Sequence, residues 1–343
     1  MKKIILLLCV CLSQTILLAN HPDSLSQQIS LMEKILQEEP LSITITTDLG
    51  ELLVNKRKTD WQTAQLQYEL SGRPYDWKMD VRPRGKFRRT ICDFPPLKLE
   101  FSKKSLGEAG LAKQDDLKLV THCLADSVLT KELIFREYLA YRLYNVASLQ
   151  SLRVQLVKVR YEDVNNKIKP FERWGILLEG IDELAERLNG EEVDQFIFQE
   201  GELDTVQHTF IAAFQMMIGN SDWSTSPIRN LKLIKQANRK ELVMIPHDFD
   251  FSALVDAPYA APRSDLGQKN LQQPLFQGVT SSRQVLQSVL KLFQTKRKAF
   301  LKEVDNFKLL SRAERFAIQR KLREFFRMIA VPEELMIYQA VGL

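Results

Sequence analysis

Zinc-binding motifs are missing from this sequence. It contains only four cysteines and four histidines, and none of them forms a CxxC or HExxH pattern. Zinc sites in proteins are built from three or four ligands of these types at characteristic spacings. The sequence therefore gives no basis for a zinc-dependent function.

Long hydrophobic runs and a strong net charge are also missing. After residue 20, no segment reaches the ~20 consecutive apolar residues that a membrane-spanning helix needs. The net charge is +5, falling to +3 without Lys2 and Lys3, and no basic tract with interleaved aromatic residues occurs. These absences argue against a transmembrane span after residue 20 and against a nucleic-acid partner.

What is present at the start of the chain is a pattern typical of a secretory signal peptide, residues 1–19. Lys2 and Lys3 precede the mostly apolar stretch 4–18, and the small residue Ala19 is followed by a polar residue. A membrane anchor is the alternative, but the apolar run is short for one. We predict an exported protein, either periplasmic or secreted.

Only two cysteines, Cys92 and Cys123, would remain after cleavage of the signal peptide. In an oxidising compartment they could form a disulfide, and two buried free thiols are the alternative. If segment 97–101 pairs antiparallel with segment 117–123, the two cysteines lie near one end of that pair. The sequence leaves both possibilities open.

The first half of the chain is rich in strand patterns. Five segments combine alternating polarity with β-branched and aromatic residues, and they span 41–47, 63–70, 77–81, 97–101 and 116–123. We expect them to form a small sheet. A helix of about four turns is predicted from residue 128, because residues 129, 133, 136, 140 and 143 share one face.

The second half is mainly helical, after two more predicted strands at 152–160 and 173–179. Helical periodicity marks 207–218 and 280–330, a hairpin is predicted at 230–247, and the proline-bearing stretch 256–278 is expected to be a loop. The predicted fold class is α+β with two lobes. Residues 20–180 would form a β-rich lobe with one long helix, and 181–343 a mainly helical lobe that carries the hairpin.

The segment Gly219–Ser252 contains the most informative group of polar residues. Pairing Lys235 with Glu241 across the hairpin would set Asn230 opposite Pro246 and bring Asn230 and Asp248 to one end. Asp222 lies in the loop that leads to the same end.

These side chains suit phosphoryl transfer. Mg²⁺ prefers hard oxygen ligands, a role that suits Asp248, Asp250 and Asn230. A separate carboxylate near the acceptor hydroxyl can orient it and take its proton, a role that suits Asp222. The alternative is structural, because aspartates beside a hairpin often serve as turn or cap residues.

At these residues the sequence resembles the spore-coat-H-like (CotH-type) kinases, a family of secreted or surface proteins with an atypical protein-kinase-like fold. The resemblance covers about residues 80–255. Its motifs are Arg84-Gly85, Pro96–Leu99, Trp174–Glu179, Gly219–Asp222, Asn230 and Pro246–Asp250, with His247 and Ile176 departing from the family pattern.

The resemblance implies roles for individual residues. It makes Asp222 the catalytic aspartate and Asp248 the principal metal ligand, assisted by Asn230 and Asp250. Lys98 would contact nucleotide phosphates and pair with Glu137, for which Glu132 is a rival. Glu179 would lie beside the nucleotide, which would be ATP or another nucleotide with Mg²⁺ or Mn²⁺.

No glycine-rich phosphate loop occurs in the N-terminal half beyond Arg84-Gly85. The nucleotide would then be held by Lys98 and by arginines of the segment 82–89, namely Arg82, Arg84, Arg88 and Arg89. The structural alternatives are a solvated turn for these arginines and a surface position at a strand end for Glu179.

Three functions follow as hypotheses. The first is an exported kinase-like phosphotransferase that modifies a hydroxyl of an unknown protein, saccharide or small molecule. The second is a pseudokinase that acts as a binding or assembly module of the cell envelope. The third is an envelope-structure protein without a nucleotide site. The basic helices after residue 280 could dock a partner or membrane headgroups, or simply present a solvated face.

Overall fold

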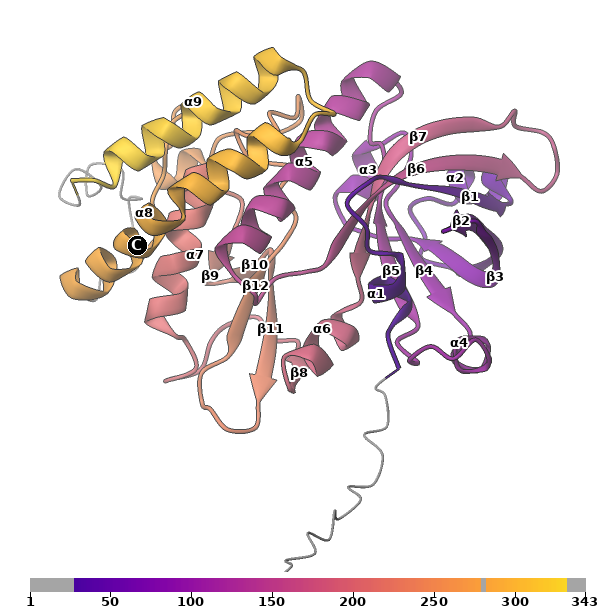
Figure 1. Cartoon of the computed structure of the whole chain (residues 1–343), viewed down its shortest axis with the longest axis horizontal. Helices are drawn as coiled ribbons and strands as arrows, with labels where there is room; N and C mark the ends of the chain where they lie inside the picture. The colour runs from indigo at the N-terminus through magenta and orange to yellow at the C-terminus, as the bar shows by residue number, and fades with distance from the viewer. Residues whose placement is uncertain (1–27, 279–281, 332–343) are drawn as a thin grey trace, which may run out of the picture.

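A computed structural model describes residues 28–278 and 282–331 (Figure 1). The predicted signal peptide, residues 1–19, lies outside the described residues. The first helix of the described chain is α1, Leu31–Ile35. The chain is a mixed α+β protein, as predicted. None of the helices in the described part of the chain has the length and hydropathy of a membrane-spanning helix.

The N-terminal half contains a closed barrel rather than the small sheet that was expected. Its strands follow one another in the order β1-β2-β3-β4-β5-β7-β6, and β1 pairs with β6 in parallel to close the ring. The sequence could not reveal this closure, because β1 and β6 are separated by more than a hundred residues. The bounds of the strands are Leu41–Thr47 (β1), Gln62–Leu70 (β2), Arg73–Pro83 (β3), Leu97–Phe101 (β4), Asp116–Val120 (β5), Val154–Asp163 (β6) and Phe171–Glu179 (β7).

Alternation along the strands separates two hydrophobic cores. In β5, Leu117 and Leu119 belong to the core inside the barrel, whereas Val120 belongs to the core of the helical half. Lys118, between the two leucines, faces the outside of the barrel, since successive side chains of a strand point to opposite faces. The outer face of β5 and β7 is therefore where the barrel meets the rest of the protein.

Four long helices form the other half of the molecule (Figure 1): α5 (Ser127–Ala147), α7 (Thr205–Ile218), α8 (Arg283–Asn306) and α9 (Arg312–Met328). The helix α5 is longer than the four turns that were expected. Although it precedes two barrel strands in the sequence, its buried side chains pack into the same core as those of α7 and α8. This core places α5 between the barrel and the later helices.

The predicted hairpin consists of β11 (Leu231–Gln236) and β12 (Val243–Pro246), extended by β8 (Gly190–Val193). Its predicted register is wrong by one residue, because Leu231, not Asn230, pairs with Pro246. The side chain of Lys235 closes the turn through the carbonyl oxygens of Arg239 and Lys240 and does not pair with Glu241. Asn230 and Asp248 still lie at the same end of the hairpin.

Several short elements had no recognisable sequence pattern, since one or two turns carry too few residues for a periodicity. They are α2 (Leu49–Val54), α3 (Arg88–Ile91), α4 (Lys103–Glu108), α6 (Ile181–Arg187), β9 (Ser224–Thr225), β10 (Ile228–Arg229) and the 3₁₀ helix η1 (Ser264–Leu266). The antiparallel pairing of β4 with β5 is confirmed, and Cys92 and Cys123 form a disulfide. Of the two alternatives for the cysteines, the structure shows the bridge.

Candidate functional site

The segment after β12 turns its two aspartates toward the barrel. Phe249 is fully buried and packs on Tyr141 of α5 and Phe214 of α7, with ring centroids 4.8 and 5.8 Å apart. The backbone N–H of Asp248 donates to the Tyr141 hydroxyl at 3.0 Å, and Asp248 has φ +62°. The phenylalanine thus anchors the segment to the helical core, which leaves Asp248 and Asp250 free to face the other way.

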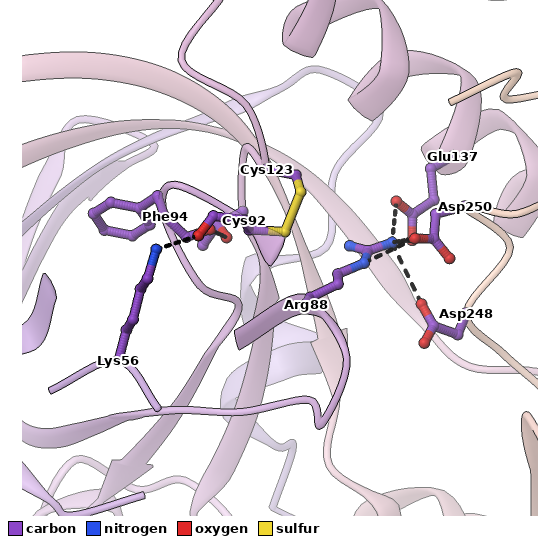
Figure 2. The surroundings of a disulfide bond; sticks show 9 residues. Lys56, Arg88, Cys92, Phe94, Cys123, Glu137, Asp248 and Asp250 are labelled. Carbon is purple, nitrogen blue, oxygen red and sulfur yellow. Dashed lines mark hydrogen bonds and ion pairs between the residues drawn. A yellow bond between two sulfur atoms is a disulfide. The ribbon is translucent and has the colours of Figure 1, made fainter. Parts of the chain in front are cut away.

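Arg88 of α3 lies between three carboxylates (Figure 2). Its Nη2 atom is 2.8 Å from Asp250 Oδ2, 3.1 Å from Glu137 Oε2 and 3.4 Å from Asp248 Oδ1. Its Nε donates to Asp250 at 2.9 Å. Arg88, Glu137 and Asp250 are buried, whereas 46% of the Asp248 side chain is exposed. We call these four residues the site cluster.

Burial and charge act against each other in the site cluster. Burial raises the pKa of Asp250 well above its usual range and raises that of Glu137, although Arg88 opposes both shifts. The pKa of Asp248 is lowered, since the nearby cations Arg88 and Arg84 outweigh the effect of burial. Asp248 is therefore the carboxylate of the cluster that combines a stable negative charge with access from solvent.

The expected pairing of Lys98 with Glu137 is not formed. Lys98 Nζ lies 3.6 Å from Asp116 Oδ2, and Glu137 is bound by Arg88. The rival, Glu132, pairs with Arg136 one turn further along α5. Arg88, which lies in the unpredicted short helix α3, binds Glu137 in place of Lys98 of β4. The contact of Lys98 with phosphates stays a prediction.

Asp222 and Asn230 contact each other as part of a compact loop. Asn230 Nδ2 donates to Asp222 Oδ2 at 3.0 Å, and Arg229 Nη1 lies 3.1 Å from Asp222 Oδ1. The Asp222 N–H donates to Asn220 Oδ1, an Asx turn of the kind that the structural alternative described. The structure thus brings these two predicted residues together, with the Asp222 carboxylate engaged on both oxygens.

Glu179 is not the surface residue of the structural alternative, because it is fully buried. Its Oε1 accepts hydrogen bonds from the Arg153 N–H at 2.7 Å and from Arg187 Nη2 at 2.6 Å. It lies at the end of β7, where the chain leaves the barrel and enters α6. These contacts fix the connection between the two halves of the molecule.

Cations on neighbouring barrel strands lie directly opposite one another. Arg82 of β3 pairs in register with Lys98 of β4, and Lys98 pairs with Lys118 of β5. Residues paired in this way share one face and lie about 5 Å apart, so like charges there destabilise the sheet. Arg82 stacks 4.3 Å from the centroid of the Trp61 ring and Lys98 has Asp116, but in the described part of the chain Lys118 has no ring or carboxylate contact of this kind. We call these three residues the cation row.

Arg84 joins the cation row to the site cluster. Among the described residues, neither the Arg84 nor the Lys118 side chain has a hydrogen bond or an ion pair closer than 4 Å. The negative charge of Asp248 interacts electrostatically with Arg84, and the positive charge of Arg84 interacts with Lys118. Burial and the charge of Arg84 lower the pKa of Lys118 to about 7. Two half-buried cations without an ion pair among the described residues thus lie near each other, and one of them, Arg84, lies near the half-exposed carboxylate of Asp248.

Sequence reasoning missed Lys118 and gave Arg88 only a general role. Lys118 had a signal, because the predicted pairing of 97–101 with 117–123 places two LKL patterns side by side. Arg88 had none, since only tertiary contacts bring its helical turn to α5 and to the segment after β12.

One hollow on the described surface contains none of these residues. It has a volume of about 570 Å³ and lies on the outside of the barrel, where Lys158 and Glu172 pair at 2.7 Å. Its lining includes none of the cations of the row, and its own lysine is neutralised. We therefore place the candidate site at the site cluster and the cation row.

The residues present fit a divalent cation only in part. No group of three or more His, Cys, Asp or Glu side chains in the described ranges is arranged to hold a metal ion. Arg88 binds Asp250 and Glu137, and the Asn230 amide nitrogen faces Asp222. Asp248 can still offer an oxygen, and Mg²⁺ is commonly held by one or two carboxylates plus substrate phosphates.

No protein-family model matches the sequence, and no curated protein matches it. Among solved structures, the chain is similar to the crystal structure of the Helicobacter pylori proinflammatory kinase CtkA, with a TM-score of 0.42 and 11% sequence identity. The similarity covers 70% of this chain and 94% of that chain. At this level it identifies neither a family nor a function.

Proposed function

We propose that this chain is an exported kinase-like phosphotransferase. It would bind ATP or another nucleotide with Mg²⁺ or Mn²⁺ between the barrel and the hairpin. The acceptor would be a hydroxyl of a protein, a saccharide or a small molecule.

One observation carries this proposal: unpaired cations lie near an exposed carboxylate. The cation row and Arg84 place positive charges where their mutual repulsion costs stability, so an anionic ligand would relieve that cost. A polyphosphate has the charge and the extended shape to contact several of these residues. Asp248 carries a negative charge and would repel a polyphosphate unless a cation lies between them. A nucleotide with a bound divalent cation would bring both the phosphates for the positively charged residues and the cation for Asp248.

Each residue has a role in this arrangement. Lys118 and Arg84 would bind phosphate oxygens, and Asp248 would hold the divalent cation, which screens the phosphate charge when it is bound. Asp222 would orient the acceptor hydroxyl and take its proton. For this, its carboxylate must exchange the contact with Arg229 for one with the acceptor.

Binding can be tested by thermal shift. ATP with Mg²⁺ should raise the melting temperature of the mature chain, because a ligand specific to the native state stabilises it. Lys118→Met should weaken binding by at least about tenfold, the usual effect of losing a charged hydrogen bond to a ligand. Lys78→Met, an exposed lysine of β3, is the matched control. Equal affinity in the two variants would contradict the assignment of Lys118.

The engagement of Asp222 by Arg229 and Asn230 favours a second candidate, a pseudokinase that binds nucleotide without turnover. Transfer of labelled phosphate from ATP, measured by autophosphorylation and by phosphate release, separates the two. An enzyme should lose turnover in Asp222→Asn and keep nucleotide affinity. A pseudokinase should bind nucleotide and show no turnover before any substitution.

Export is supported by the Cys92–Cys123 disulfide, because structural disulfides persist mainly in oxidising compartments. The intact mass of protein recovered from the periplasm or medium should correspond to a chain that begins near residue 20. A full-length chain found only in the cytoplasm would contradict this part of the proposal.

A further inference from the structure

Positive charge is concentrated in the last two long helices. Residues 283–331 contain 13 Lys and Arg but only 4 Asp and Glu, a net charge of +9, whereas the whole chain has a net charge of +5. The rest of the chain is therefore negative, with a net charge of −4. A charge distribution this uneven turns one side of a protein toward an anionic partner.

Two of the four acidic residues do not balance the outer side of α8 and α9. Glu303 Oε1 accepts a hydrogen bond from Arg142 Nε at 2.8 Å, and Glu314 Oε1 accepts one from Arg136 Nη2 at 3.1 Å. Both arginines belong to α5, which lies between the barrel and the later helices. Only the other two acidic residues remain to balance the exposed cations.

The exposed cations follow one stripe on each helix. They are Lys291, Lys298 and Lys302 on α8, and Arg312 and Arg320 on α9. Their spacings of seven, four and eight residues are close to whole helical turns, so the members of each stripe share a face. None of the five has an ion pair within the described ranges.

The two stripes belong to one surface. The helices α8 and α9 lie side by side along the edge of the molecule opposite the barrel (Figure 1). Lys291 and Arg297 of α8 line the same hollow of about 480 Å³ as Arg327 of α9. We define the outer basic face as Lys291, Arg297, Lys298, Lys302, Arg312, Arg320 and Arg327.

Apolar side chains are exposed among these cations. Phe316 lies about one turn from both Arg312 and Arg320, and 62% of it is exposed. Leu292 follows Lys291 on α8 and is 43% exposed. Apolar side chains beside Lys and Arg are stabilised where they enter the boundary between the headgroups and the acyl chains of a lipid layer.

We propose that the outer basic face docks the protein onto a lipid surface with anionic headgroups. Its lysines and arginines bind the lipid phosphates, and Phe316 and Leu292 enter the layer. The face extends over both helices, and α8 alone is about 36 Å long, so it matches an extended surface better than a single phosphate ligand. The inference is independent of the proposed nucleotide site between the barrel and the hairpin.

Co-sedimentation with vesicles tests this inference. The mature chain is used, because the apolar stretch 4–18 would itself enter lipid. It should bind vesicles of phosphatidylglycerol mixed with phosphatidylcholine more tightly than vesicles of phosphatidylcholine alone. Added salt should weaken the binding, because salt screens the charges. Equal binding to both kinds of vesicle, or binding to neither, would overturn the inference.

The double variant Arg312→Gln, Arg320→Gln removes two charges from the outer basic face. Its partition onto the mixed vesicles should fall by about fivefold per charge, the usual effect of a Lys or Arg near an anionic surface. The matched control is Lys78→Gln, Lys113→Gln, which removes two exposed charges from the barrel half and should bind like the wild type. An equal loss in both double variants would overturn the assignment to this face.

Phe316→Ser distinguishes a lipid surface from a soluble anionic partner. The variant keeps every charge, so it should bind dextran sulfate, a soluble polyanion, like the wild type. Its partition onto the mixed vesicles should fall by about fourfold or more, the effect of losing a partly buried aromatic ring. Unchanged partition, or binding of the wild type to the polyanion without binding to vesicles, would overturn the lipid assignment.

Discussion

The protein buries two groups of charged residues, and their charges are balanced differently. At the end of β7, Arg153 and Arg187 meet Glu179, Glu183 and the partly exposed Glu33, two guanidinium groups for three carboxylates. We call this group the β7–α6 cluster. In the site cluster, Arg88 alone meets three carboxylates. In the first group the fully buried Glu179 is paired with Arg187, whereas the second group lies beside Arg84 and Lys118, which have no ion pair among the described residues.

This difference separates a structural role from a functional one. A buried ion pair that is satisfied within the protein needs no ligand, and breaking it leaves a buried charge without compensation. An imbalance that the protein does not correct destabilises the fold, so it is understandable where a ligand completes the arrangement. The following predictions test whether the two clusters differ in this way.

The largest effect should come from Arg187→Ala. It leaves the fully buried Glu179 carboxylate without its guanidinium partner, and we expect a loss of about 3–5 kcal/mol in the free energy of unfolding. Urea denaturation measures this. Arg160→Ala removes an exposed ion pair and should have little effect. A loss no larger than that of the control would mean that the β7–α6 cluster is not a structural element.

The next effect is a dependence of stability on pH through Glu183. Burial raises the pKa of this carboxyl from 4.5 to about 7, despite the hydrogen bond from Ser30. The folded protein therefore holds a proton that the unfolded chain releases, and its free energy of unfolding should fall as pH rises from 4.5 to 7, by about 3 kcal/mol. Glu183→Gln should remove this fall, as measured by denaturation across that range. An unchanged pH profile would disprove it.

A smaller effect concerns Lys118 and ligand affinity. With its pKa at about 7, Lys118 is mostly neutral above that pH, so binding of an anionic nucleotide must take up a proton. Affinity should fall between pH 7 and 9, by at most about tenfold per pH unit. Calorimetry in buffers of different ionisation enthalpy should detect the proton uptake. Lys118→Arg, which stays charged, should bind with nearly constant affinity, and a parallel fall in this variant would point to another group.

The smallest effect on stability should come from Asp248→Asn. The substitution removes a half-exposed carboxylate whose ion pair with Arg88 is screened by solvent, so the free energy of unfolding should change by less than about 1 kcal/mol, in contrast to the loss in Arg187→Ala. The affinity for nucleotide with Mg²⁺ should nevertheless fall by about tenfold or more, the effect of losing a charged contact to a ligand. A large loss of stability with unchanged affinity would mean that Asp248 has a structural role and not a role in ligand binding.

Much of the secondary structure could be predicted because its signals are local. The strand 41–47 coincides with β1, and the hairpin differs by one residue in register. The antiparallel pairing that would bring Cys92 and Cys123 together is present, and so is the bridge. The pairing of Lys98 with Glu137 could not be predicted correctly, because Arg88 competes for that glutamate from a turn without a sequence signature.

The sequence by itself determined the mixed α+β composition, the order of the longer elements and the place of Asn230 and Asp248 at one end of the hairpin. Each depends on alternation, periodicity or a turn between neighbouring strands. Only the tertiary structure decided that the barrel closes through β1 and β6 and that Arg88 binds Asp250 and Glu137. It also decided that Lys118 has no hydrogen bond or ion pair among the described residues, whereas Glu179 accepts hydrogen bonds from Arg153 and Arg187. These contacts join residues far apart in the chain, and their energies depend on burial and on neighbouring charges that exist only after folding.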